Sequence, residues 1–185
     1  MVKALLALAL IALPFEDGIS AFSGGRVDSP DGKWSVWAAG NDTEDMRAVA
    51  RLNGPDVRER GLMSFERNVQ IFWPTEGGRV VLVERTIHFA SLHVFTLAAE
   101  EAGPDLTQAD IEQHLAKLLP QIATIENRLL AFGRIGSETC VLIEESGLPP
   151  GRTEGSYITR RGSFWLDFRA KRAVPIQACP DARLD

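Results

Sequence analysis

Three histidines are the first candidates for catalytic or metal chemistry, because imidazole titrates near neutral pH and binds metal ions. They are His88, His93 and His114. His88 and His93 are five residues apart, and an odd spacing along a strand directs two side chains to opposite faces. We therefore expect no metal site and no cofactor. An enzyme would need a site assembled from scattered residues such as His88, His93, Glu144 and Asp167.

The usual sequence motifs of catalysis are missing from the chain. It has no Gly-x-Ser-x-Gly elbow, no phosphate-binding loop, no dinucleotide-binding glycine pattern and no His-Glu-x-x-His helix. Glu144 and Glu145 are adjacent, so in a strand their carboxylates face opposite sides and cannot share a proton. We therefore expect no catalytic residues, and the sequence favours a non-enzymatic protein.

Aromatic and cationic side chains are the candidates for binding. Tryptophan offers a large contact area at low entropic cost, and paired arginines recognise an acidic partner or an anionic glycan. The candidate binding residues are Trp37, Trp73, Trp165, Arg160 and Arg161. The alternative interpretation is that the tryptophans fill the core of a sheet protein and the arginines are ordinary surface charge.

Composition limits the class of protein. The chain has 185 residues, 45% of them hydrophobic and 24% charged, which is typical of one globular domain. Its formal net charge of −5 argues against nucleic-acid binding, which needs clustered excess cations.

The two cysteines are compatible with an oxidising compartment. A disulfide between Cys140 and Cys179 would close a 39-residue loop and stabilise the fold by about 3–4 kcal/mol. The alternative is a buried free Cys140 and an exposed Cys179, and the sequence leaves both open.

Most of the chain has the patterns of strands and turns, and short connections favour antiparallel meanders. The expected strands are 33–38, 46–52, 69–73, 79–85, 92–97, 127–133, 138–145, 156–161 and 163–169. One segment, 107–122, has helical periodicity instead, with Thr107 as the cap and Asp110 three residues later. Its apolar stripe is Ile111, Leu115, Leu118, Leu119 and Ile122, and Pro120 is expected to end or kink the helix.

A weak internal repeat has a period of about 45 residues. The segment 29–34 (SPDGKW) opens one strand, and 73–79 (WPTEGGR) holds the equivalent place before another. Over residues 27–97 the sequence resembles the WD-like repeats of bacterial TolB-type β-propellers. This resemblance implies four-stranded antiparallel blades that begin with such turns.

The N-terminus has the pattern of a secretory signal peptide. Lys3 precedes an apolar run, 4–15, that is too short to span a membrane, and small residues follow up to Ala21. We expect a signal peptide over 1–21 and a single β-rich domain over 22–185, exported to the periplasm or secreted, with no membrane span.

These patterns together predict a mainly β fold of antiparallel, blade-like meanders packed as an incomplete propeller or a sandwich, with one amphipathic helix at about 107–122. At about 45 residues per blade the domain is too short for a closed ring. The predicted function is an exported, non-enzymatic module that binds an envelope protein or a ligand, with self-association possible through its sheet edges. The alternative is a small secreted hydrolase or carbohydrate-active protein.

Overall fold

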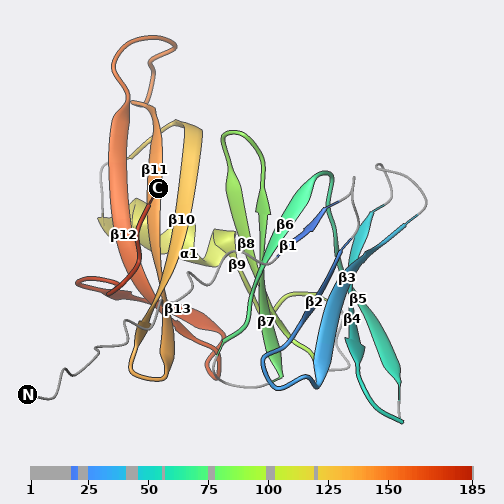
Figure 1. Ribbon diagram of the computed structural model, residues 1–185. Helices are drawn as coiled ribbons and strands as arrows, with labels where there is room; N and C mark the ends of the chain where they lie inside the picture. Colours follow the sequence, from blue (N-terminus) through green and yellow to red (C-terminus); the bar gives the residue numbers. More distant parts are fainter. Residues whose placement is uncertain are drawn as a thin grey trace, which may run out of the picture.

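The computed structural model describes residues 18–20, 25–40, 46–55, 57–74, 78–98, 103–118 and 121–184. Over these residues the fold is mainly β, with three antiparallel sheets and one helix, which confirms the predicted fold class (Figure 1). Apart from the first strand, which joins the middle sheet, the sheets follow one another along the chain, and each contains a meander of consecutive strands.

The N-terminal sheet has the order β2-β3-β4-β5. The bounds of these strands are Arg26–Asp28, Trp34–Ala39, Arg47–Leu52 and Arg58–Ser64. Met46, Ala48 and Ala50 alternate along the chain and are buried together against the middle sheet, as expected of a strand with one buried face. The sequence does not predict β5, because its residues lack a period of two and a bulge shifts its register against β4 between Ala48 and Val49.

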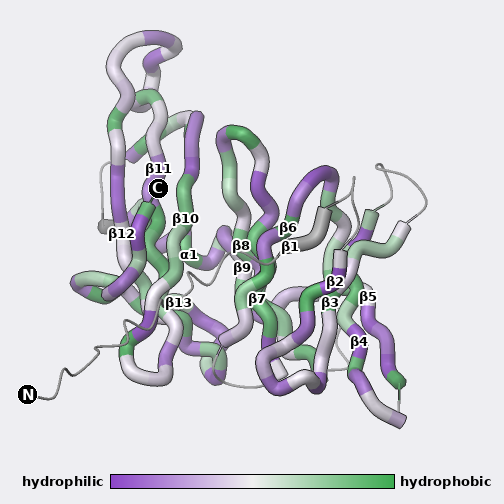
Figure 2. Tube along the Cα trace, viewed as in Figure 1, coloured by the Kyte–Doolittle hydropathy of each residue, from purple (hydrophilic) through white to green (hydrophobic). Residues whose placement is uncertain are grey.

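The middle sheet has the order β1-β6-β7-β8-β9. The bounds are Gly18–Ser20, Asn68–Phe72, Arg79–Arg85, Ala90–Thr96 and Leu106–Thr107. In β7, Val80 and Leu82 pack toward the N-terminal sheet, while Val81 and Val83 pack toward the C-terminal sheet. The middle sheet is therefore buried on both faces, and Figure 2 shows β7 as hydrophobic along most of its length.

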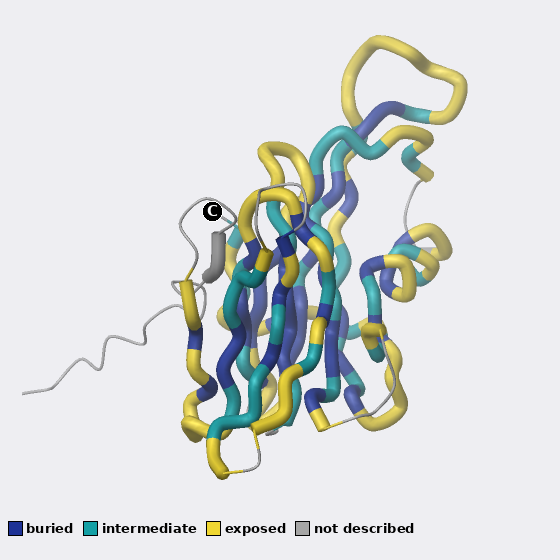
Figure 3. Tube along the Cα trace, turned by 90° about the vertical axis from the view of Figure 1, so that its right-hand side faces the viewer, coloured by how far each residue is buried: buried dark blue, intermediate teal, exposed yellow. Residues whose placement is uncertain are grey.

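The C-terminal sheet has the order β10-β11-β12-β13. The bounds are Thr124–Ile135, Glu138–Leu148, Ile158–Asp167 and Arg172–Ile176. Two predicted strands, 156–161 and 163–169, are one strand, β12, because Gly162 lies inside the sheet, paired with Ile143. β13 is not predicted by the sequence. The long β11–β12 loop is exposed and stands clear of the sheets (Figure 3).

Helix α1 covers Gln108–Leu118 and links the middle and C-terminal sheets. The Asp110 carboxylate accepts hydrogen bonds from the Thr107 backbone N–H, at 2.7 Å, and from the Thr107 hydroxyl, at 2.9 Å; the first of these is the bond that residue N3 of a capping box makes. Ile111 and Leu115 are fully buried. The helix is shorter than predicted, because it ends before Pro120 and leaves Ile122 in the following connection.

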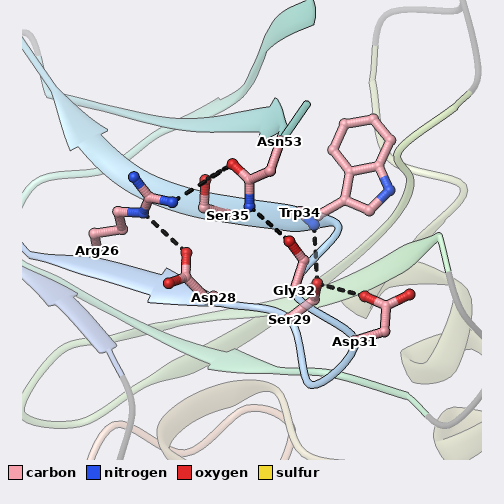
Figure 4. Close-up of polar contacts among 8 residues, drawn as sticks. All are labelled: Arg26, Asp28, Ser29, Asp31, Gly32, Trp34, Ser35 and Asn53. Atoms are coloured by element: carbon pink, nitrogen blue, oxygen red, sulfur yellow. Dashed lines mark hydrogen bonds and ion pairs between the residues drawn. The ribbon is translucent and has the colours of Figure 1, made fainter. Parts of the chain in front are cut away.

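The turn between β2 and β3 shows why its residue types matter (Figure 4). The Ser29 hydroxyl donates to Asp31 at 2.7 Å and accepts from the Trp34 backbone N–H at 2.9 Å. Gly32 has a positive φ of 67°, and the equivalent turns before β7 and β11 also contain a glycine with positive φ, Gly78 and Gly136. The first hairpin of each meander therefore has a turn that contains a glycine with positive φ.

The predicted signal peptide lies mostly outside the described residues. Of 1–21, only Gly18–Ser20 is described, and it forms β1 against β6.

Candidate binding surface

The residues proposed for a scattered catalytic site lie apart. His93 pairs with Leu82 and so faces the N-terminal sheet, whereas Glu144 points away from the core on the far side of the C-terminal sheet. His88 lies in the β7–β8 turn, where its Nδ1 is 3.1 Å from the Asn127 side-chain oxygen. Among the described residues no hydrogen bond or ion pair joins any two of these groups, and they do not form one site.

Asp167 and His93 have perturbed pKa values with local structural causes. The Ala170 backbone N–H and the nearby Arg172 hold the pKa of the Asp167 carboxyl below its ordinary value of 3.8, and this arrangement closes the β12–β13 turn. Burial lowers the pKa of His93, partly opposed by Glu84. The residues that shift these two pKa values, Ala170, Arg172 and Glu84, are not candidate catalytic residues.

The adjacent glutamates face opposite sides of β11, as the sequence predicts, and have different environments. Glu145 is fully buried on the inner face and accepts hydrogen bonds from Arg128 Nε at 2.9 Å and Arg160 Nε at 2.7 Å. Arg128 also contacts Glu112 on α1. Arg160 therefore belongs to a buried ionic network that joins the sheet to the helix, and it is not a surface binding residue. No sequence pattern links Arg128 or Glu112 to Glu145, because their proximity depends on strand register.

The three tryptophans proposed for binding lie on different surfaces. Trp37 lies on the outer face of the N-terminal sheet, opposite Val49. Trp73 packs against the core between the N-terminal and middle sheets. Trp165 lies on the outer face of the C-terminal sheet, and Arg161 shares that face and pairs with Glu144 at 2.5 Å. Only Trp165 and Arg161 are therefore brought to one face.

The outer faces of the two terminal sheets differ in chemistry. The N-terminal outer face carries the half-buried Trp37 and Val49 together with polar pairs: Arg26 and Asp28 at 2.9 Å, Arg51 and Glu59 at 3.9 Å, and Ser35 and Asn53 at 3.1 Å. The outer face of the C-terminal sheet also carries polar pairs, Arg161 with Glu144 and Ser146 with Thr159, but it presents five apolar side chains that are exposed or half-buried. They are Leu129, Leu142, Trp165, Val174 and Ile176, and we call this set the C-terminal outer face.

A disulfide fastens the C-terminal segment across this face. Cys140 on β11 is bonded to Cys179, with 5.6 Å between their Cα atoms. The segment lies so close to β10 that a Cβ on Gly133 would be 1.9 Å from the Pro180 carbonyl oxygen. The segment thus covers Gly133, which is buried, whereas Leu129 further along β10 is 37% exposed.

Two cavities adjoin the C-terminal sheet. One, of about 420 Å³, lies beside β12 and is lined mainly by apolar residues, among them Leu115, Leu142, Phe164 and Ile176. The other, of about 440 Å³, lies near the β10–β11 and β12–β13 turns and is more polar, with Glu138, Asp167 and Arg169 in its wall. Both volumes fall in the range of small-ligand sites.

Within the described part of the chain, no group of three or more His, Cys, Asp or Glu side chains is placed to hold a metal ion. No described helix is long and apolar enough to cross a membrane.

Comparison with known proteins identifies no relative. No protein-family model matches the chain, and neither a curated protein nor a solved structure matches it. The resemblance to propeller repeats therefore stays a prediction from the sequence.

Proposed function

We propose that this chain is an exported, non-enzymatic binding module that takes a protein partner of the cell envelope on its C-terminal outer face. The observation that carries the proposal is the contrast between the two terminal sheets. The N-terminal outer face carries Trp37 and Val49 among polar pairs, whereas the C-terminal outer face presents five partly exposed apolar side chains. Exposed apolar patches next to polar rims mark interaction surfaces.

The remaining support is indirect and comes from three features. The leader-like N-terminus and the disulfide both fit an exported protein. The separation of His88, His93, Glu144 and Asp167 favours binding over hydrolysis, because catalysis requires reacting groups within hydrogen-bond reach.

Site-specific photo-crosslinking in the producing cell tests this proposal. A photoreactive amino acid at Leu129 is expected to capture one dominant envelope protein. The same amino acid at Val49, on the N-terminal outer face, is the matched control and is expected to capture none. Equal products from both positions, or none from either, would overturn the proposal, and cell fractionation of the wild-type chain tests export separately.

A further inference from the structure

The β11–β12 loop, residues 149–157, is open to other proteins. Residues 150–157 are all exposed, and Figure 3 shows that the loop stands clear of the sheets. Its first turn is closed by a backbone hydrogen bond from the Arg152 N–H to the Pro149 carbonyl oxygen, at 3.2 Å. Exposed loop tips that contain small and polar residues are the preferred sites of proteolytic cleavage. The loop is therefore a candidate site for a peptidase.

Arg152 determines the class of peptidase. It lies in the exposed part of the loop, and its side chain forms no hydrogen bond or ion pair with another residue that the structure describes. A peptidase whose primary pocket ends in a carboxylate cleaves after such a cationic side chain. Other exposed arginines, such as Arg26 and Arg58, lie in strands whose backbone is paired with a neighbour. The backbone around Arg152 is accessible without opening a strand.

The disulfide lies across this loop. Cys140 is on β11, before the loop, and its partner Cys179 follows β13, after the loop. Hydrolysis after Arg152 would divide the chain into the pieces 1–152 and 153–185, with one of the two cysteines in each piece. The pieces would therefore stay covalently joined.

Non-covalent contacts also join the two pieces. Residues 140–147 of β11 pair with residues 158–165 of β12. The Arg160 side chain, in the second piece, donates to the fully buried Glu145 carboxylate of the first piece at 2.7 Å. Phe164 of the second piece is fully buried in the core beneath the C-terminal sheet. None of these contacts involves the loop, so a cut after Arg152 leaves them all in place.

We propose that the β11–β12 loop is a processing site, at which an arginine-specific peptidase cleaves the chain after Arg152, and that the product is one folded, two-chain molecule. The bond between the Arg152 carbonyl carbon and the Thr153 nitrogen breaks and one water molecule is consumed. Arg152 gains a terminal carboxylate and Thr153 a terminal ammonium group. This inference is independent of the proposed function, because it uses no residue of the C-terminal outer face.

Limited digestion of the folded full chain with an arginine-specific endopeptidase tests the position of the cut. Mass spectrometry is expected to show a first product heavier than the intact chain by one water molecule. On reduction this product should separate into two pieces, one of which begins at Thr153. A first cut at any other position would overturn the assignment of the site.

Two variants provide the matched comparison. Arg152→Gln is expected to slow the first cut about tenfold or more. Arg67→Gln removes another exposed arginine, in the short connection between β5 and β6, and is expected to change the rate less than about twofold. Equal effects of the two variants would contradict the proposal.

Urea unfolding tests whether the cut protein is still one folded molecule. Without reductant, its unfolding midpoint is expected to be independent of protein concentration, because the disulfide joins the pieces. With reductant, the midpoint of the cut protein should fall on dilution, whereas that of the uncut protein should not. Loss of the native tryptophan fluorescence on cleavage alone, or a midpoint of the cut, reduced protein that does not change with concentration, would contradict the two-chain product.

The chain recovered from the producing cell tests whether processing takes place there. A disulfide-linked form with Thr153 as a new N-terminus is expected for the wild-type chain and should be absent for Arg152→Gln. Recovery of uncut wild-type chain alone would overturn the proposal. Saturable inhibition of the endopeptidase by a chain that stays uncut would show instead that the loop binds peptidases without being cleaved, and would also overturn it.

Discussion

Removal of the Glu145 charge is the sharpest test of how the C-terminal sheet is held together. Glu145 is fully buried and accepts hydrogen bonds from Arg128 and Arg160, whose side chains are only 10% and 6% exposed. Glu145→Gln keeps the shape but leaves two poorly solvated guanidinium groups without their shared carboxylate. Breaking a buried ion pair in this way costs about 3–5 kcal/mol.

The assay is urea unfolding followed by tryptophan fluorescence, with the free energy of unfolding obtained by linear extrapolation. The matched control is Glu144→Gln, one residue away on the opposite face, where the side chain of the Arg161 partner is 65% exposed. A pair as solvated as this one is worth about 1 kcal/mol or less.

A third variant separates the charge from the packing. Replacing Arg128, Glu145 and Arg160 together with Met, Leu and Met removes all three buried charges, and such replacements are often neutral or stabilising. We expect this triple variant to recover most of the stability lost in Glu145→Gln. A loss below about 1 kcal/mol in Glu145→Gln, or a triple variant as unstable as the single one, would refute the reasoning.

Three further predictions concern other parts of the fold. Replacing both Cys140 and Cys179 with Ser should lower the free energy of unfolding by about 4 kcal/mol, because the bond closes a 39-residue loop; an unfolding midpoint insensitive to reductant would contradict this. Gly162→Ala should cost about 1–3 kcal/mol, because its Cβ would lie 2.6 Å from a buried leucine of α1. Gly61→Ala in β5, with no atom within 4 Å, is the control and should be neutral in the same urea assay. Burial raises the pKa of the Asp105 carboxyl, but its lysine and threonine partners lower it more, so the pKa lies below its ordinary value of 3.8. Its ionised form therefore stabilises the fold above about pH 4, and this contribution is lost as the pH falls through the lowered pKa. Asp105→Asn should flatten the acid side of the stability profile, and an unchanged profile would exclude this carboxyl as a cause.

The parts of the fold that the sequence predicts are those specified by local pattern. The cap at Thr107 and the alternation in β4 each depend on residues close together in the chain, and both are confirmed. The sequence also predicts that Glu144 and Glu145 face opposite sides of one strand, as the structure shows.

The parts that the sequence does not predict depend on contacts between distant elements. β5 lacks alternation because Arg60 reaches across to the middle sheet, where an apolar residue would otherwise face the core. The buried position of Arg160 depends on the register between β11 and β12, which brings it opposite Glu145. For the same reason the candidate binding tryptophans are spread over three surfaces, since residue type alone does not indicate which face of a sheet a side chain occupies.

Hydrogen bonds between neighbouring sheets restrict the residue types that can stand at the donor positions. Arg60 donates to the backbone oxygens of Thr96, at 2.7 Å, and Gly103, at 3.3 Å, and Arg85 donates to that of Leu130 at 2.9 Å. Every residue type supplies a carbonyl oxygen, so the hydrogen bonds themselves place no demand on residue identity at the acceptor positions. The donors have no such freedom, because lysine lacks the forked guanidinium that lets Arg60 reach two acceptors at once. A saturation mutagenesis map should therefore show low tolerance at Arg60 and Arg85, with lysine no better than other residue types at Arg60.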